Sequence, residues 1–210
     1  MKFSLTCILI VFAISANAQK TALTEQGETV ILYPDGTWKF RKSDENASGE
    51  IPLNAKRIFK PEDATFQVKS KSVQGAAVWI SPKLWSFENG KGEDAAEYEF
   101  TLRNEDAYGM MIAEGIEIPI LSLRDIAVEN ARNAAPDLEI IEEEYKMVNG
   151  IKVLSIQMNG TIRGIPFSYL NYYYSSKSGS IQLLTYTSSN LFSNYRSRME
   201  KLLNGLVCSE

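Results

Sequence analysis

The chain has 210 residues, 44% of them hydrophobic, and carries 22 Lys and Arg against 26 Asp and Glu, a formal net charge of −4. An acidic chain without clustered cations is a poor partner for nucleic acid, whose binding depends on phosphate neutralisation. The chain contains no histidine, which excludes Ser-His-Asp catalysis, Cys-His catalysis and His-containing zinc sites.

The first 18 residues have the order of an export signal. Lys2 supplies a cation, residues 5–14 form an apolar run, and the sequence Ala-Asn-Ala at 16–18 matches an A-x-A cleavage site. The apolar run is shorter than the about 20 residues that a bilayer-crossing helix needs. We therefore expect residues 1–18 to be a cleaved signal peptide, and the protein to be exported, periplasmic or secreted, without a transmembrane segment after cleavage.

Two short β-rich runs surround an Asp-Gly turn and predict a β-hairpin over residues 29–40. Charged and small residues follow and predict a linker over 41–56. Because an isolated hairpin is only marginally stable, Trp38 of this segment is a candidate binding residue. The predicted organisation is an N-terminal hairpin module over 19–40, the linker, and one α+β domain over 57–210.

Alternation and helical spacing place the first elements of the main domain. Apolar and polar residues alternate from 96 to 103, and a second strand over 108–117 pairs with this one. Ser122 and Asp125 resemble a capping box, and apolar residues at helical spacing predict a helix over 122–134.

Strand-like segments dominate the rest of the chain. Asn-Gly and Ser-Gly turns separate an antiparallel meander, whose segments are 138–147, 151–158, 165–174 and 180–187. Earlier β-type runs lie near 66–68 and 76–80, and an amphipathic helix is predicted over 189–206. We predict an α+β fold with one antiparallel sheet of about six strands flanked by helices, preceded by the β-hairpin. The predicted core residues are Tyr98, Phe100, Leu102, Ile126, Leu154, Ile156, Met199 and Leu202.

The main domain resembles the PsbP-like fold family. The matching features are the sequence I-S-P-K-L-W at 80–85 and the meander with Gly150, Gly160 and Gly179 at its turns, over about residues 60–208. The resemblance implies a sheet covered by helices on a protein that docks to partners, and it implies no catalytic residues. The leading hairpin, with its Asp-Gly-Thr-Trp sequence, is similar to a short module found on other exported bacterial proteins.

Carboxylates are the main remaining candidates for catalysis. Glu142 and Glu144 share one strand face and could form the acid pair of a glycosidase. Glu139 and Glu143 are expected on the other face, and acids on both faces are more simply explained by an exposed edge strand. Cys208, the one cysteine after the signal, has no histidine to activate it. No catalytic residue, metal site or cofactor is predicted.

Aromatic residues are dense near the C-terminal end of the meander: Phe167, Tyr169, Tyr172, Tyr173, Tyr174 and Tyr186. Alternation places Tyr172 and Tyr174 on one face, and Tyr169 and Tyr173 on the other. The cluster is either a stacking platform for a ligand or partner, or part of a central strand that helices bury on both faces. With Trp38, the residues Tyr172 and Tyr174 are the predicted binding residues.

The leading hypothesis is a non-enzymatic protein of the bacterial cell envelope that docks a partner protein or assembly. A carboxylate-based hydrolase and a small-ligand carrier remain as alternatives. A hydrolase would bring two acids together in a cleft, with at least one raised pKa. A carrier would enclose an apolar pocket between the sheet and the 122–134 helix, and a docking protein would expose an apolar patch.

Overall fold

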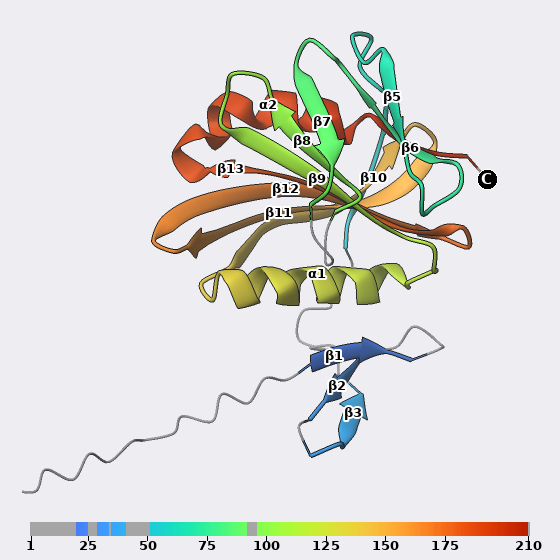
Figure 1. Ribbon diagram of the computed structural model, residues 1–210, viewed down its shortest axis with the longest axis vertical. Coiled ribbons are helices and arrows are strands. Elements are labelled where there is room, and N and C mark those ends of the chain that lie inside the picture. Colours follow the sequence, from blue (N-terminus) through green and yellow to red (C-terminus); the bar gives the residue numbers. More distant parts are fainter. Residues whose placement is uncertain (1–19, 25–28, 34, 41–50, 92–95, 210) are drawn as a thin grey trace, which may run out of the picture. The chain divides into compact units, whose positions relative to one another are not determined.

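The computed structural model describes residues 20–24, 29–33, 35–40, 51–91 and 96–209 (Figure 1). The chain divides into two compact units, Met1–Arg41 and Lys42–Glu210. Each unit has its own sheet or sheets, and each is described by itself.

The first unit is a three-stranded antiparallel sheet of β1 (Lys20–Leu23), β2 (Thr29–Leu32) and β3 (Trp38–Phe40). The predicted hairpin is present as β2 and β3, and Gly36 adopts the positive φ that its turn requires. Asp35 Oδ1 accepts hydrogen bonds from both the amide and the hydroxyl of Thr37, which lowers the Asp35 pKa. Strand β1 was not predicted, because its four residues carry no turn signal and alternate only weakly.

The second unit is built on an eight-stranded sheet in the order β4-β10-β11-β12-β13-β9-β8-β7. In chain order the strands are β4 (Leu53–Ile58), β7 (Trp85–Asn89), β8 (Tyr98–Leu102), β9 (Ala107–Glu114), β10 (Glu139–Val148), β11 (Ile151–Ile162), β12 (Ile165–Ser176) and β13 (Gly179–Ser188). All neighbours pair antiparallel except β4 and β10, which are parallel.

The predicted sheet of about six antiparallel strands is therefore too small. Its six strands are present as β8 to β13, and one further strand is added at each edge, β4 and β7. Strand β4 begins at Leu53, inside the stretch predicted as a linker, where polar residues suit an edge strand that is largely exposed. Residues 41–50 of that predicted linker lie outside the described residues.

A second, three-stranded sheet has the order β14-β6-β5, from β5 (Phe66–Lys69), β6 (Ala76–Ile80) and β14 (Leu206–Cys208). The predicted helix over 189–206 is thus shorter: it divides into η2 (Ser189–Leu191) and α2 (Phe192–Leu203), and Leu206 belongs to β14. A Cβ on Gly205 would lie 2.0 Å from the Trp79 carbonyl oxygen, so only glycine allows the chain to turn there from α2 into β14.

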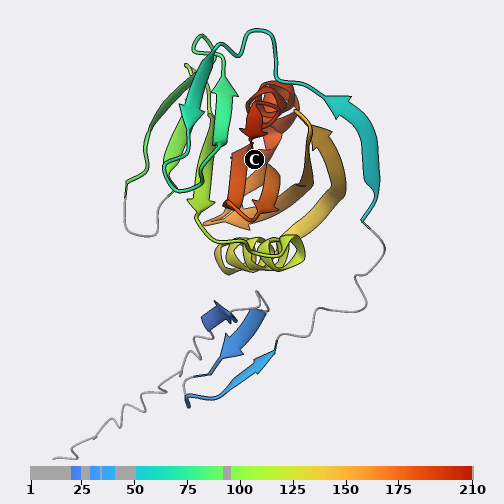
Figure 2. The same cartoon turned by 90° about the vertical axis from the view of Figure 1, so that its right-hand side faces the viewer.

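Helix α1 (Ile120–Ala134) confirms the predicted helix but begins two residues earlier than expected, and Ser122 with Asp125 forms no capping box. Pro119 occupies the N-cap with extended backbone angles, and no side chain caps the helix. Asp125 instead accepts a hydrogen bond from the neighbouring Arg124. Helices α1 and α2 lie on opposite faces of the large sheet (Figures 1 and 2).

Seven of the eight predicted core residues are at most 7% exposed, and Ile126 is partly exposed. The prediction that these residues are buried together in one cluster is wrong, because the sheet separates them into two groups. Phe100 and Leu202 belong to the main cluster on the α2 side. Leu154 and Ile156 alternate with residues of that side, so they lie on the opposite face with α1.

Candidate functional site

The three predicted binding residues lie in very different environments. Trp38 on β3 is 54% exposed, whereas Tyr172 and Tyr174 on β12 are only 1% and 8% exposed. The Tyr172 hydroxyl donates to Asn204 Oδ1 at 2.9 Å, and burial raises the pKa of Tyr172. The two tyrosines are therefore built into the core under α2, and a binding role for the three residues stays a prediction.

A group of partly exposed aromatic side chains lies instead on the face that the large sheet shares with α1. Tyr108 on β9, Tyr186 on β13 and Tyr169 on β12 stand in register across three neighbouring strands. The ring centroids are 5.6 Å apart for Tyr108 and Tyr186 and 5.8 Å apart for Tyr186 and Tyr169. The Phe167 ring lies 6.4 Å from Tyr186. These separations are typical of interacting aromatic pairs.

Aliphatic side chains extend this aromatic row on the same strands. Met110 and Ile112 alternate with buried residues on β9, and Leu184 lies in register with Met110 on β13. All are partly exposed, and Tyr108 is 36% exposed, because α1 packs over β12 and leaves this part of the sheet less covered. We call this surface the aromatic face. Its residues are Tyr108, Met110, Ile112, Phe167, Tyr169, Leu184 and Tyr186.

The sequence identified Phe167, Tyr169 and Tyr186 within the aromatic-rich segment but missed Tyr108, Met110 and Leu184. The alternation of residues 108, 110 and 112 was the signal that could have found the β9 part. Only the strand order, which puts β9 beside β13, brings these residues together.

Two carboxylates border the aromatic face. Glu99 on β8 stands opposite Met110, and Glu88 on β7 stands opposite Glu99. Like charges directly opposite each other on one face are unfavourable. Lys91 Nζ lies 3.0 Å from Glu88 Oε1 and partly offsets this. Burial raises the pKa of Tyr186, and the charge of Glu99 adds to the effect. The aromatic face therefore has an acidic border at β7 and β8.

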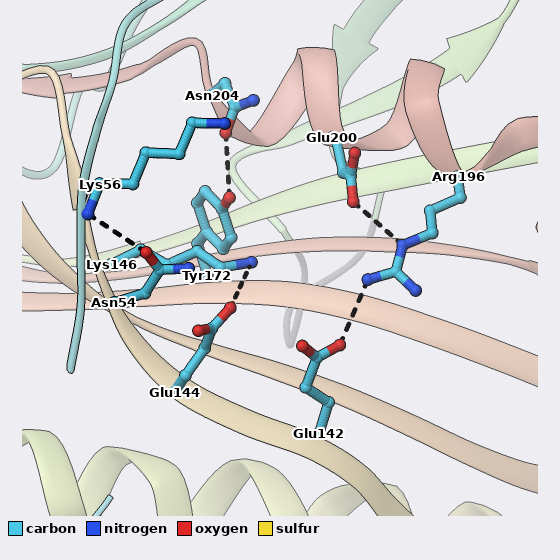
Figure 3. Close-up of polar contacts among 9 residues, drawn as sticks. All are labelled: Asn54, Lys56, Glu142, Glu144, Lys146, Tyr172, Arg196, Glu200 and Asn204. Carbon is cyan, nitrogen blue, oxygen red and sulfur yellow. Dashed lines mark hydrogen bonds and ion pairs between the residues drawn. The ribbon is translucent and has the colours of Figure 1, made fainter. Parts of the chain in front are cut away.

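A polar cluster lies on the opposite face, between α2 and strands β10 and β4 (Figure 3). Arg196 on α2 donates to Glu200 Oε1 at 3.0 Å and to Glu142 Oε2 at 3.2 Å. Lys146 Nζ lies 3.2 Å from Glu144 Oε1 and 5.5 Å from the centroid of the Tyr172 ring. The arrangement alternates positive and negative groups, so each carboxylate in it has a cation beside it.

This cluster tests the predicted acid pair. Glu142 and Glu144 do share a face, but Glu142 pairs with Arg196 and Glu144 pairs with Lys146, so neither is placed as one of two carboxyl groups that flank a substrate. Among the described carboxyl groups with a clear pKa shift, the pKa is lowered, because each accepts hydrogen bonds; these groups are Asp35, Glu105 and Asp137. The geometry gives the hydrolase alternative no support.

Two predictions about these acids were wrong. Strand β10 is not an edge strand, because β4 pairs with it. Glu139 does not share a face with Glu143, because a register shift between Ile140 and Glu142 returns Glu139 to the α2 side. Glu143 alone faces α1, where Arg124 binds its two oxygens at 2.8 and 3.1 Å. This pairing raises the pKa of Arg124.

The part of the chain that the structure describes contains no group of three or more acidic or cysteine side chains placed to hold a metal ion. None of its helices combines the length and the apolar character that spanning a bilayer requires. Cys208 lies partly buried in β14 as a free thiol.

The fold places the second unit in a recognisable class: a large twisted sheet with one helix on each face, closed by a small sheet that contains the C-terminal strand. This is a PsbP-like α+β architecture. No protein-family model matches the chain, and no curated protein matches its sequence.

Two solved structures are similar to this chain in fold. Cyanobacterial PsbP (CyanoP) from Synechocystis sp. PCC 6803 has a TM-score of 0.54 and 13% identity, covering 69% of this chain and 92% of that one. LpqN from Mycobacterium tuberculosis, described as involved in cell envelope biogenesis, has a TM-score of 0.50 and 9% identity, covering 69% of this chain and 90% of that one. At these identities the likeness shows the fold, and the predicted PsbP-like resemblance is confirmed at that level.

Proposed function

We propose that this chain is an exported, non-enzymatic protein of the bacterial cell envelope that docks a partner protein through the aromatic face. The observation that carries the proposal is the continuous row of tyrosine rings on β9, β13 and β12, next to the part of the sheet where α1 packs. Exposed apolar patches on a folded domain mark interaction sites. The description of LpqN as an envelope biogenesis protein supports the cellular setting.

The composition of the aromatic face favours a protein partner with a particular chemistry. Tyrosine supplies rigid contact area with a polar end and is enriched at protein interfaces. The acidic border of Glu88 and Glu99 favours a basic residue on the partner, and an arginine there could also stack on a tyrosine ring. The partner is therefore an apolar protein surface that carries an arginine or lysine at one side.

The test captures partners from the native envelope by cross-linking, with the full chain as bait. The double variant Tyr108→Ser and Tyr186→Ser should weaken capture about 30-fold, as expected when central tyrosines are hot spots. Glu99→Lys should weaken capture most at low salt, because the acidic border acts through long-range charge. Thermal unfolding confirms that each variant is folded.

The matched control is Phe59→Ser, since Phe59 is an aromatic residue 71% exposed and outside the aromatic face. It should leave capture unchanged. Capture of the same proteins, in the same amounts, by the tyrosine variant and by the unaltered chain would contradict the proposal.

A further inference from the structure

A second surface on the α1 face of the large sheet combines apolar and positively charged side chains. Ile58 packs on the main cluster, so Arg57 beside it points to the α1 side, where it stands in register with Met147 of β10. Lys152 of β11 stands in register with Met147 from the other side. We call this surface the basic face. Its residues are Leu53, Arg57, Tyr145, Met147 and Lys152.

The basic face is accessible, and its cations are not neutralised. Leu53 is 54% exposed, and Arg57 and Lys152 are exposed as well. Lys152 Nζ lies 3.9 Å from the centroid of the Tyr145 ring, and within the described residues neither cation pairs with a carboxylate. Glu143, on the same side of β10, is already bound by Arg124 of α1. The basic face therefore suits a partner that supplies both apolar contact and negative charge.

The aromatic face has the complementary character. Glu99 at its border stands opposite Glu88, and within the described residues no cation lies within ion-pair distance of the Glu99 carboxylate. Two carboxylates in register repel each other, so a cation brought to this border is stabilising. The aromatic face has no cation among its own residues, so the same face of another copy would not supply one.

The two faces lie on the same side of the large sheet but on different strands. The basic face belongs to β4, β10 and β11, and the aromatic face belongs to β12, β13 and β9. They share no residue, so one molecule presents both at once. We propose that the basic face of one copy of this chain docks on the aromatic face of a second copy. This inference rests on the proposed function, in which the aromatic face is a docking surface, and names its partner.

The contact matches charge with charge and apolar with apolar side chains. It places Arg57 and Lys152 of one copy against the acidic border of Glu88 and Glu99 of the other, where a guanidinium can also stack on a tyrosine ring. Because the two faces differ, the contact is heterologous, and each copy keeps one face for a further copy.

Sedimentation velocity of the full chain at rising concentrations tests the contact, and the mean mass should rise above that of one chain. Two double variants each remove one half of it: Tyr108→Ser with Tyr186→Ser, and Arg57→Glu with Lys152→Glu. Each should weaken self-association about 30-fold. A mixture of the two variants retains one intact basic face and one intact aromatic face, so it should form a complex of two chains that extends no further. Complex formation in the mixture also shows that both variants are folded.

The matched control is Lys69→Glu with Lys177→Glu, which changes the net charge equally at two exposed positions outside both faces. It should associate as the unaltered chain does. Four outcomes would overturn the inference: the mass of one chain at all concentrations, unchanged association in either double variant, equal weakening in the control, or no complex in the mixture.

Cross-linking capture from the envelope separates this inference from the proposed function. If the unaltered chain stays a single copy but captures other envelope proteins through its tyrosines, the inference fails and the proposed function stands. If the tyrosine variant loses neither self-association nor capture, both fail.

Discussion

At the scale of single residues, Asn149 shows how a turn residue can join distant parts of the chain. The sequence identifies it as half of an Asn-Gly hairpin turn, and its φ of 49° fits that role. Its side-chain nitrogen also donates to the backbone oxygens of Asn204 and Leu206 at 2.8 and 2.7 Å. Its side-chain oxygen accepts from the Lys60 amide at 2.7 Å. Asn149 thus ties the meander to the end of α2 and to the loop after β4.

We expect Asn149→Ala to lower the free energy of unfolding by about 2–4 kcal/mol, from three lost hydrogen bonds and the strain of a positive φ. The matched control is Asn104→Ala, which has a φ of 59° in the β8–β9 turn but no side-chain hydrogen bond within the described residues. It should lose only about 1–2 kcal/mol. Chemical denaturation measures both, and equal losses would show that the three bonds contribute nothing.

At the scale of elements, α2 packs very closely against strand β9 at Gly109. A Cβ on Gly109 of β9 would lie 2.9 Å from Leu202 Cδ2 and 3.0 Å from the Leu184 carbonyl oxygen. Leu202 is 1% exposed, so its side chain has little room to move aside. Glycine at this position therefore lets the helix pack directly on the strand backbone.

Gly109→Ala should lower the free energy of unfolding by about 1–3 kcal/mol through overpacking, and Leu202→Ala should lower it by about 2–5 kcal/mol through the cavity it leaves. In the double variant the alanine at 109 fills part of that cavity, so the two losses should not add. Denaturation of all four proteins measures this coupling. Simple additivity would mean that Leu202 does not press on Gly109.

The strands that the sequence predicted are those that local residue patterns identify. Strands β8 to β13 alternate clearly or end at Asn-Gly or Ser-Gly turns, so residue spacing alone identifies them. Strands β4 and β14 have no such pattern: the first is an exposed edge, and the second pairs with β6 more than 120 residues earlier in the chain. Their existence depends on long-range pairing, which a local pattern does not contain.

The candidate sites were predictable to a smaller degree. Aromatic density pointed to β12, but alternation could not say which face α1 would cover. The partly exposed rings on this strand are Phe167 and Tyr169, whereas Tyr172 is buried. The pairing of Glu142 with Arg196, 54 residues later in the chain, likewise could not be predicted from either segment alone.

At the scale of the whole molecule, the two faces of the large sheet are covered to different extents in the described part of the second unit. Both α2 and the small sheet bury one face, where the main cluster lies. Helix α1 covers the other face in part and leaves the aromatic face accessible. A PsbP-like core of this kind can be stable on its own while one side of its sheet remains available for a partner.

The proposed docking role requires the chain to reach the envelope, and the first residues make a definite prediction about how it does so. Cleavage after Ala18 should give a protein that begins at Gln19, because signal peptidase requires small side chains at positions 16 and 18. Intact mass measurement of the protein recovered from the periplasm or medium of a bacterial host tests this directly. Ala18→Arg should block cleavage and leave the precursor with the membranes.

Asn17→Gln is the matched control, since the middle position of the A-x-A sequence has no size requirement, and it should be processed normally. A protein recovered with Met1 intact from the cytoplasm would contradict export, and with it the envelope setting of the proposed function.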